Sequence, residues 1–385
     1  MSGVTRSVWQ SRSVDARSAD VCIVGAGILG ASAAWWLGRL RPGLRVVLLD
    51  ARWPAYGASG RNAGFLLQGA VTDYVSDIAL YGPDRARRLR SFTHENRDQL
   101  LAEIPPDSFA FKASGSLVVA GDAGEEERLV ESAALMERDG FPAEVLTGVE
   151  VNARLGSRGY LSGLLQSSGG MLNPGDLVSQ LVARSGAQVK TRSPALYLDE
   201  REVEGAEFRV EAERVIACAG PWLPQLLPGA SDWVRPVRAQ MLALQPEAPL
   251  RLDLPIYTHE GYYYLRPDGA GRILVGGARH LHAAGEVGFR DVTTPALQED
   301  LLAYAQTHFR GLDGAKVVAR WAGTMGFSPD GLPVIGVGPR GVLVATGFTG
   351  HGMAYGFRAG RLLANLALGI PDEAADLFSP ERFRG

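Results

Sequence analysis

The sequence predicts an α/β fold, α+β overall, with a second region of antiparallel sheet. Three observations indicate this. A glycine-rich turn joins a short apolar run to a helix near the N-terminus, buried-strand runs return late in the chain, and residues 233–318 alternate apolar and polar positions with frequent turns. Apolar runs are typical of buried parallel strands, whereas alternation indicates antiparallel sheet. The length of 385 residues suits two domains.

The stretch Asp20–Asp50 reads as a strand, a glycine turn, a helix and a second strand. Gly25, Gly27 and Gly30 form a G-x-G-x-x-G pattern after the first apolar run, and the second run ends in Asp50. Such glycines let the backbone approach a pyrophosphate, whose charge the helix N-terminus stabilises, while the acid accepts ribose hydroxyls. The stretch therefore predicts a Rossmann-like FAD/NAD(P)-binding domain.

Residues 51–64 are dense in glycine and small polar residues, which predicts a loop directly after the cofactor-acid strand. Ser59, Arg61 and Asn62 offer hydrogen-bond donors there. From about residue 81 to 101 the pattern is helical and charged. The simplest interpretation is that its arginines lie on a solvated helix face: Arg85, Arg87, Arg88 and Arg90.

The middle of the chain continues with alternating strands and helices. Strands are predicted at 114–120, 188–192, 196–198, 214–220 and 341–346. Helices are predicted at 125–140, at 174–186 with Asn173 as N-cap, and from the glycine loop after 346 to Leu368. The late return of buried strands predicts a discontinuous cofactor domain of residues 1–80, 145–228 and 320–385. A substrate-binding domain of residues 81–144 and 229–319 interrupts it.

Composition excludes several classes of protein. A net charge of −3 and a pI near 6.1 give no reason to expect nucleic acid as a partner, and no apolar run is long enough for a membrane span. Cys22 and Cys218 lie in apolar runs, so we expect neither a disulfide nor a metal site. The absence of a disulfide framework predicts a cytoplasmic location. Residues 1–19 lack a signal-peptide core, and a surface arm is favoured there over a transit peptide. The 280–286 segment, with two histidines and a glutamate, is expected to be an exposed turn without metal.

A second glycine cluster follows the last predicted strand, with Gly347, Gly350 and Gly352 before a helix. A dinucleotide alone needs only the first motif. The second motif implies that something large and flat lies between the two ends of the chain. A helix N-terminus stabilises a ring that gains negative charge on reduction, which favours a flavin over a nicotinamide.

These motifs resemble the D-amino-acid oxidase family of FAD-dependent oxidoreductases, which includes oxidases of glycine, sarcosine and γ-glutamylputrescine. The matching pieces appear in family order over nearly the whole chain: Gly25-Ala-Gly-Ile-Leu-Gly30, Gly57-Ala-Ser-Gly-Arg-Asn-Ala-Gly64, Ala219-Gly-Pro-Trp222, Trp321-Ala-Gly-Thr-Met-Gly-Phe-Ser-Pro-Asp330-Gly-Leu-Pro333 and Gly347-Phe-Thr-Gly-His-Gly-Met353.

The resemblance implies extended, non-covalent FAD and oxidation of a carbon next to an amine nitrogen, giving an imine that hydrolyses in water. It implies that the FAD-binding residues are Gly25, Gly27, Ile28, Leu29, Gly30, Asp50, Ala51, Arg52, Ala58, Ser59, Arg61, Asn62, Ala63, Gly64, Val189, Ala219, Gly220, Trp222, Gly323, Asp330, Gly347, Thr349, Gly350, His351, Gly352 and Met353. Positioning the C–H bond over the ring and binding the amine uncharged do most of the catalytic work in such a site.

Departures from the family narrow this expectation. Gly323 stands where some members attach the flavin through a cysteine, and Met325 stands where amino-acid-oxidising members place an arginine. A buried carboxylate without its cation is costly. An α-amino-acid substrate therefore requires a substitute cation, for which the candidates are Arg61, Arg266 and Arg279.

The substrate side is predicted to contain His351, Met325, Tyr262 and Tyr264 as catalytic-site residues. Tyr262 and Tyr264 have the period-two spacing of one strand face, and with Tyr257 they would form an aromatic wall for an amine. The lysine that some family members use to promote reaction with oxygen has no counterpart. Oxygen is the expected electron acceptor, and a quinone or protein acceptor stays open.

Several alternatives remain at this stage. Within the fold, the enzyme is alternatively an FAD-dependent dehydrogenase of amines or 2-hydroxy acids. From other classes, a nicotinamide dehydrogenase would leave the second glycine cluster unexplained, and a non-catalytic flavin-binding subunit would bind FAD without turnover. The expected partners are a small amine or amino acid and the electron acceptor, and the oligomeric state is left open.

Overall fold

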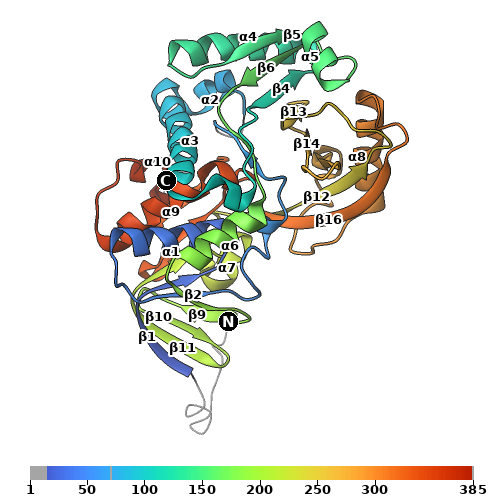
Figure 1. Cartoon of the computed structure of the whole chain (residues 1–385). Helices are drawn as coiled ribbons and strands as arrows, with labels where there is room; N and C mark the ends of the chain where they lie inside the picture. Colours follow the sequence, from blue (N-terminus) through green and yellow to red (C-terminus); the bar gives the residue numbers. More distant parts are fainter. Residues whose placement is uncertain (1–14, 70–71, 384–385) are drawn as a thin grey trace.

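The computed structural model describes residues 15–69 and 72–383. It contains two eight-stranded sheets, joined where β12 and β16 extend away from the first sheet (Figure 1). The described helices are α1 (Ile28–Leu40), α2 (Tyr74–Tyr81), α3 (Pro83–Glu103), α4 (Ala123–Arg138), α5 (Gly148–Leu155), α6 (Pro174–Arg184), α7 (Leu223–Leu226), α8 (Pro295–His308), α9 (Gly352–Leu368) and α10 (Ala375–Phe378). None of these helices is both long and apolar enough to cross a membrane.

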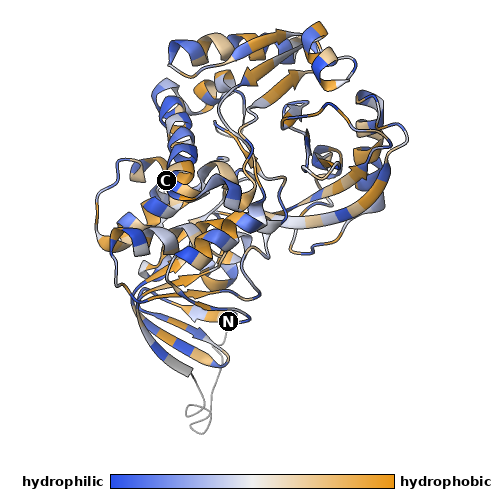
Figure 2. Ribbon diagram, viewed as in Figure 1, coloured by the Kyte–Doolittle hydropathy of each residue, from blue (hydrophilic) through white to orange (hydrophobic). Residues whose placement is uncertain are grey.

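The first sheet is mainly parallel, and its central strands have both faces buried. Its strands, in spatial order, are β17 (Val334–Val337), β18 (Leu343–Thr346), β11 (Phe208–Ala217), β1 (Asp15–Val24), β2 (Val46–Leu49) and β8 (Gln188–Lys190), with β10 (Glu202–Gly205) and β9 (Ala195–Leu198) at the side of β11. On β1, Ile23 faces the cluster under α1 and α9, whereas Cys22 faces the opposite cluster. Two buried faces explain the apolar sequences of β2 and β18 and of residues 21–24 in β1. β10 and the first part of β11 instead alternate hydrophilic and hydrophobic residues (Figure 2).

The prediction of a surface arm over residues 1–19 is wrong for residues 15–19, which belong to β1. β1 begins at Asp15 because β11 offers parallel partners as far down as Phe208. The remainder of the predicted arm, residues 1–14, lies outside the described residues.

The second sheet is antiparallel except for the β13–β4 pair. In spatial order it contains β16 (Lys316–Phe327), β12 (Arg235–Gln245), β15 (Ile273–Gly277), β14 (Tyr263–Pro267), β13 (Ile256–Thr258), β4 (Ser116–Ala120), β6 (Ser162–Gln166) and β5 (Glu144–Thr147). A separate pair joins β3 (Phe65–Leu66) to β7 (Gly170–Met171). The α8 helix, which the sequence pattern did not reveal, covers one face of the second sheet. Residues 145–228 are predicted from the sequence to belong to the cofactor domain. β6 falls within this range, but it pairs in the second sheet.

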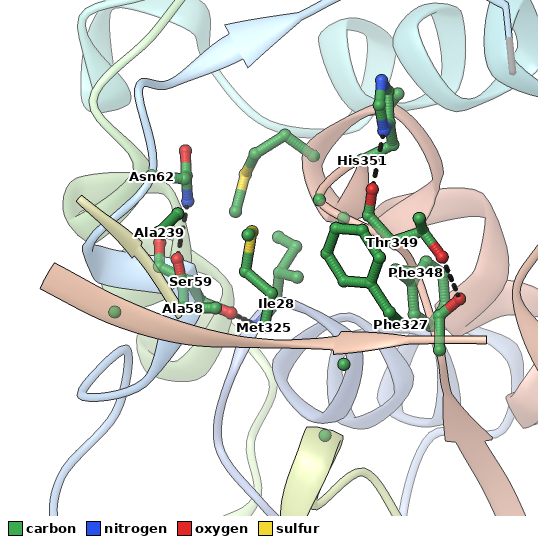
Figure 3. Close-up of a pocket in the computed structure, with 18 of the residues that line it drawn as sticks. Ile28, Ala58, Ser59, Asn62, Ala239, Met325, Phe327, Phe348, Thr349 and His351 are labelled. Atoms are coloured by element: carbon green, nitrogen blue, oxygen red, sulfur yellow. Dashed lines mark hydrogen bonds between the residues drawn. The ribbon is translucent and has the colours of Figure 1, made fainter. Parts of the chain in front are cut away.

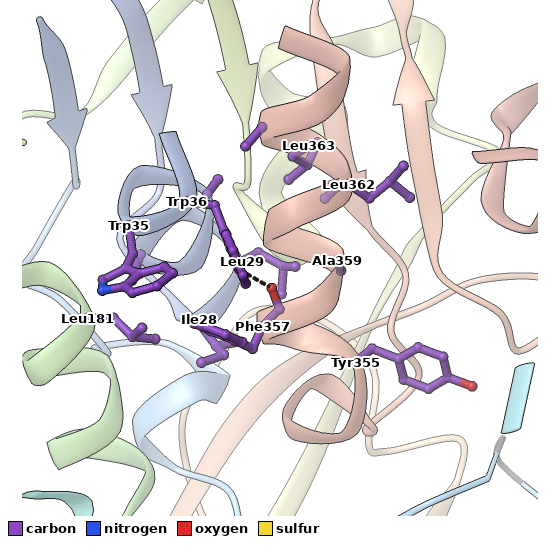
Figure 4. Close-up of a cluster of buried hydrophobic side chains, with 14 of the residues drawn as sticks. Ile28, Leu29, Trp35, Trp36, Leu181, Tyr355, Phe357, Ala359, Leu362 and Leu363 are labelled. Carbon is purple, nitrogen blue, oxygen red and sulfur yellow. Dashed lines mark hydrogen bonds between the residues drawn. The ribbon is translucent and has the colours of Figure 1, made fainter. Parts of the chain in front are cut away.

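Helices α1 and α9 cross at very close range beneath the two glycine loops (Figure 4). The indole N–H of Trp36 donates to the Phe357 carbonyl oxygen at 2.9 Å. A Cβ at Gly360 would lie 2.3 Å from Ser32 Cβ, and one at Gly356 would lie 2.6 Å from Ile28 Cγ1. The crossing therefore depends on glycine at both positions.

The substitution Gly360→Ala is expected to lower the free energy of unfolding by about 1–3 kcal/mol, because the helices must separate to admit the methyl group. The shift of the urea unfolding midpoint measures this. Gly285→Ala is the matched control, because its Cβ would meet its first neighbour, the His282 carbonyl oxygen, only at 3.6 Å. An equal loss of stability in both variants would contradict the role given to the crossing.

Candidate functional site

A cavity of about 1160 Å³ opens at the carboxyl ends of the parallel strands β1, β2, β11 and β18. This is the edge at which open α/β sheets bind ligands. The second sheet forms the other wall of the cavity, through β12, β14 and β16. All of the sequence-predicted site residues line the cavity except Gly30, Gly64, Val189 and Asp330. Residues from six separate segments of the sequence are thus brought together: 25–29, 50–63, 219–222, 262–264, 323–325 and 347–353.

The first glycine turn has the shape that a dinucleotide pyrophosphate requires. Gly25 has φ +102°, and a Cβ there would lie 2.4 Å from the Cys218 carbonyl oxygen. A Cβ at Gly27 would lie 2.9 Å from Ser59 Oγ, which accepts a hydrogen bond from Ile28 N at 2.9 Å. The glycine turn therefore lines the cavity without a Cβ, and Ser59 occupies the first amide of α1. Gly30 serves packing instead, because its Cβ would meet the Gly25 carbonyl oxygen.

Asp50 lies at the end of β2 and closes this turn. Its carboxylate accepts from Ala26 N at 2.8 Å and from Arg52 N at 2.7 Å. An ionised carboxylate has about four acceptor positions. Asp50 can therefore hold the loop and still accept the ribose hydroxyls predicted from the sequence.

The 58–64 loop is fixed by its own side chains (Figure 3). Asn62 Nδ2 donates to the carbonyl oxygens of Ala58 and Ser59 at 3.0 and 2.9 Å, and its Oδ1 accepts from Gly64 N at 2.7 Å. Arg61 Nε donates to a main-chain carbonyl at 2.9 Å, and its Nη1 donates to another at 2.9 Å. The loop therefore presents a rigid backbone to the cavity.

The second glycine loop leads from β18 into α9. Asn96 on α3 holds the first turn of that helix, because its Nδ2 donates to the Met353 carbonyl oxygen at 3.1 Å and its Oδ1 accepts from Phe357 N at 2.8 Å. His351 Nδ1 lies 3.1 Å from the Thr349 carbonyl oxygen. A carbonyl only accepts, so Nδ1 carries the proton and Nε2 is an acceptor. Desolvation lowers the pKa of His351 below its ordinary value, which keeps the imidazole neutral.

Met325 and Phe327 on β16 project into the cavity (Figure 3), and Arg279 lies over the Phe327 ring with its Cζ 4.9 Å from the ring centroid. Burial lowers the pKa of Arg279. Within the described residues Arg279 forms no ion pair with a carboxylate. Of the three candidate cations, it is the one whose guanidinium forms no hydrogen bond with the part of the chain that the structure describes.

The other two candidate cations are engaged by the main chain. Arg61 donates to two carbonyl oxygens and lies 3.6 Å from an Asp291 carboxylate oxygen. Arg266 Nη1 donates to the carbonyl oxygens of Gly64 and Leu172 at 3.2 and 2.9 Å, and it does not line the cavity. Both hold loops in place.

An aromatic wall continues from Arg279. The rings of Tyr257 and Tyr264 lie 5.9 Å apart, and Phe65 lies 5.2 Å from Tyr257. Burial raises the pKa of Tyr264 to about 12, so its hydroxyl stays protonated. The prediction that Tyr262 shares the strand face is wrong. Tyr262 lies in the turn before β14, because three preceding residues with positive φ bend the chain there, and its ring stacks on His280.

The structure does not bring Asp330 or Val189 to the cavity. The Asp330 carboxylate pairs with Arg382 at 2.7 Å, and its carbonyl oxygen accepts from Tyr81 Oη at 3.0 Å. Val189 lies in β8 beside Leu48. Within residues 15–69 and 72–383, no group of three metal-ligating side chains gathers.

Sequence reasoning also missed a buried arginine that lines the cavity. Arg90, interpreted as part of a solvated face, is only 5% exposed and lines the cavity from α3. Arg85, Arg87 and Arg88 are not among the buried residues. The available signal was the helical period, since Ala86, Leu89 and Phe92 are also buried.

A phosphate-binding turn on one wall of a cavity, facing an aromatic sheet on the other, defines a dinucleotide-dependent oxidoreductase. The chain belongs to the DAO family of FAD-dependent oxidoreductases, whose family model matches residues 20–366. FAD is the cofactor of that family.

Relatives and solved structures agree with this assignment. The chain is 28% identical over 370 residues to the γ-glutamylputrescine oxidoreductase of Escherichia coli (strain K12), covering 91% of this chain and 84% of the relative. It is 26% identical over 369 residues to the glycine oxidase of Geobacillus kaustophilus (strain HTA426), covering 90% and 92%. The crystal structure of glycine oxidase from Geobacillus kaustophilus has the same fold, with a TM-score of 0.79, 21% identity and coverage of 94% and 98%.

The substitution Asn62→Leu is expected to weaken FAD binding by about tenfold or more, because three hydrogen bonds of about 1 kcal/mol each hold the loop. Fluorescence titration of the apoprotein with FAD measures the dissociation constant. Asn152→Leu is the matched control, since Asn152 bonds the carbonyl oxygens of Gly148 and Tyr160 away from the cavity. Unchanged FAD affinity in Asn62→Leu would contradict the role of the loop.

Proposed function

We propose that this protein oxidises an α-amino acid at the carbon next to its nitrogen, giving an imine that hydrolyses in water. Bound FAD supplies the two-electron acceptor for that carbon. The residues proposed to hold the isoalloxazine are those of the 58–64 loop, Gly323 and the Gly350–Met353 loop. The Gly25–Gly27 turn supports this placement, because it brings Cβ-free backbone and the N-terminal end of α1 to the cavity wall. The first sheet then belongs to the cofactor domain and the second sheet to the substrate domain.

Binding of FAD is proposed to be non-covalent. Gly323 offers no nucleophile to the flavin. Cys218 lines the cavity, but burial raises the pKa of its thiol to about 12. A thiol in that state is not nucleophilic at neutral pH.

The observation that carries the proposal is Arg279, which lies in the cavity over Phe327 beside Tyr264 and forms no ion pair with a carboxylate of the described residues. A partly buried guanidinium without a direct carboxylate partner favours an anionic ligand, and arginine matches a carboxylate with two parallel hydrogen bonds. Arg279 thereby takes the place of the family arginine that Met325 replaces. We infer that it binds the α-carboxylate of the substrate.

The remaining cavity groups suit an uncharged amine. Neutral His351 presents Nε2 as an acceptor, which is the form able to take a proton from a substrate ammonium. Tyr257 and Tyr264 provide a flat apolar wall that positions the substrate. Oxygen is the proposed electron acceptor, which the glycine oxidase among the relatives supports.

The test is the visible spectrum of the purified protein under anaerobic conditions, before and after addition of amino acids, simple amines and 2-hydroxy acids. Flavin bands that bleach with amino acids and recover in air support the proposal. Bleaching without recovery in air points to a dehydrogenase that uses a quinone or protein acceptor. Bleaching with 2-hydroxy acids alone, or a yellow protein that no substrate reduces, overturns it.

The substitution Arg279→Met is expected to raise the KM for the amino acid that reduces the flavin by about 10- to 100-fold, because a charge-assisted hydrogen bond contributes about 1.5–3 kcal/mol. Steady-state kinetics are measured on this amino acid and on the matching amine without a carboxylate. The comparison separates a loss of carboxylate binding from a general loss of activity. Arg320→Met is the control, since Arg320 donates to Gln298 and does not line the cavity. Equal losses on both substrates would mean that Arg279 does not bind the carboxylate.

A further inference from the structure

The cavity continues well beyond the aromatic wall. In the register of the second sheet, Tyr264 lies opposite Tyr257, Tyr257 opposite Val118, and Val118 opposite Leu164. All four residues line the cavity. Neighbouring strands are about 4.8 Å apart, so this row extends for about 14 Å along the sheet. The cavity of about 1160 Å³ includes both the proposed FAD site and this row.

Arg90 closes the far end of this row. Its Nη2 donates to Gln166 Oε1, and Gln166 lies opposite Ser116 on the same sheet. The guanidinium lies 5.4 Å from the ring centroids of both Tyr74 and Phe141. These contacts hold the side chain in one place, on the wall of the cavity.

Arg90 forms no direct ion pair in the described part of the chain. Arg90 Nε is buried and has no hydrogen-bond partner, and the same is true of Gln68 Nε2, which also lines this end. Asp77 is the acidic group that acts on Arg90 electrostatically, but it forms no ion pair with Arg90, and one of its oxygens accepts from Thr72 Oγ1 at 2.6 Å. Burial lowers the pKa of Arg90 to about 10, which still leaves it charged at neutral pH.

Two other buried arginines of this protein have carboxylate partners. Arg238 meets the Glu286 carboxylate at 2.6 Å, and Arg358 meets the Asp372 carboxylate at 2.8 Å. Arg266 Nε is also unpartnered, but Arg266 Nη1 donates to two main-chain carbonyls and the side chain does not line the cavity. Arg90 is thus a buried cation that faces the cavity with a donor to spare. Such an arrangement costs folding free energy unless a ligand supplies the acceptor.

We propose that Arg90, Gln68 and Gln166 form a distal subsite that binds a carboxylate at the far end of an extended amino-acid substrate. This inference rests on the proposed function, which binds the α-carboxylate of the substrate at Arg279 beside Tyr264. The apolar row across the sheet binds the chain that joins the two ends. The substrate class is therefore an amino acid with a long spacer and a second, terminal carboxylate.

The test uses non-oxidisable acids on the FAD-loaded protein, so that it reads binding without turnover. Straight-chain dicarboxylates from succinate through suberate to dodecanedioate are titrated by calorimetry, each beside the monocarboxylate of the same length. The second carboxylate is expected to strengthen binding by about tenfold or more once the chain spans the row, and to add nothing in short acids. A gain that is absent at every length overturns the proposal.

Variants assign the gain to the subsite. Arg90→Met is expected to abolish the advantage of dicarboxylate over monocarboxylate, and Arg90→Lys to keep part of it. Arg87→Met is the matched control, because Arg87 is on the same helix and pairs at the surface with Asp84. An advantage that survives Arg90→Met overturns the proposal.

Val118→Phe keeps the test decisive if the buried Arg90 variants fail to fold. It obstructs the row without touching Arg90 and is expected to abolish the binding of long dicarboxylates while acetate still binds. Unaltered long-chain binding in this variant contradicts the path across the sheet. If no amine or amino acid reduces the flavin, the proposed function fails, whereas these titrations still decide whether Arg90 binds a distal carboxylate.

Discussion

The close crossing of α1 and α9 is the constraint on which the cavity depends. Each helix begins at a glycine loop, and the two loops are more than three hundred residues apart in the sequence. Because Gly356 and Gly360 admit Ile28 and Ser32 at van der Waals range, both helix N-termini open into the same cavity. A ligand can therefore have its charged middle at α1 and its ring at α9. Neither loop alone would define such a site.

The substrate wall is positioned by buried ion pairs and amides. Arg238 on β12 pairs with Glu286, which anchors the segment after β15 that carries Arg279. Asn96 performs a similar task for the first turn of α9. These polar groups are buried with their partners satisfied, which gives fixed geometry rather than large stability. The second sheet thereby keeps its aromatic face at a fixed distance from the glycine loops.

The sequence was most informative where local chemistry determines conformation. The first glycine turn, Asp50 at the end of β2 and the Asn173 cap of α6 each follow from short-range requirements, and the structure has all three. Positions that depend on distant contacts could not be read in this way. Asp330 lies in a family motif, but Arg382 from the C-terminal segment binds its carboxylate. Arg90 looks like its exposed neighbours until the second sheet is placed against α3.

The charge distribution of the cavity restricts what it can bind. Beside Arg279 the two groups proposed to contact the substrate are neutral, because desolvation lowers the pKa of His351 and raises that of Tyr264 to about 12. Carboxylates line other parts of the cavity, among them Asp73, Glu125 and Asp291. A charged group bound beside His351 and Tyr264 would meet no counter-charge from these two side chains and would pay its full desolvation penalty. The substrate proposed above has its uncharged part at this place. Binding the reacting amine in its neutral form then follows from the same burial that positions it.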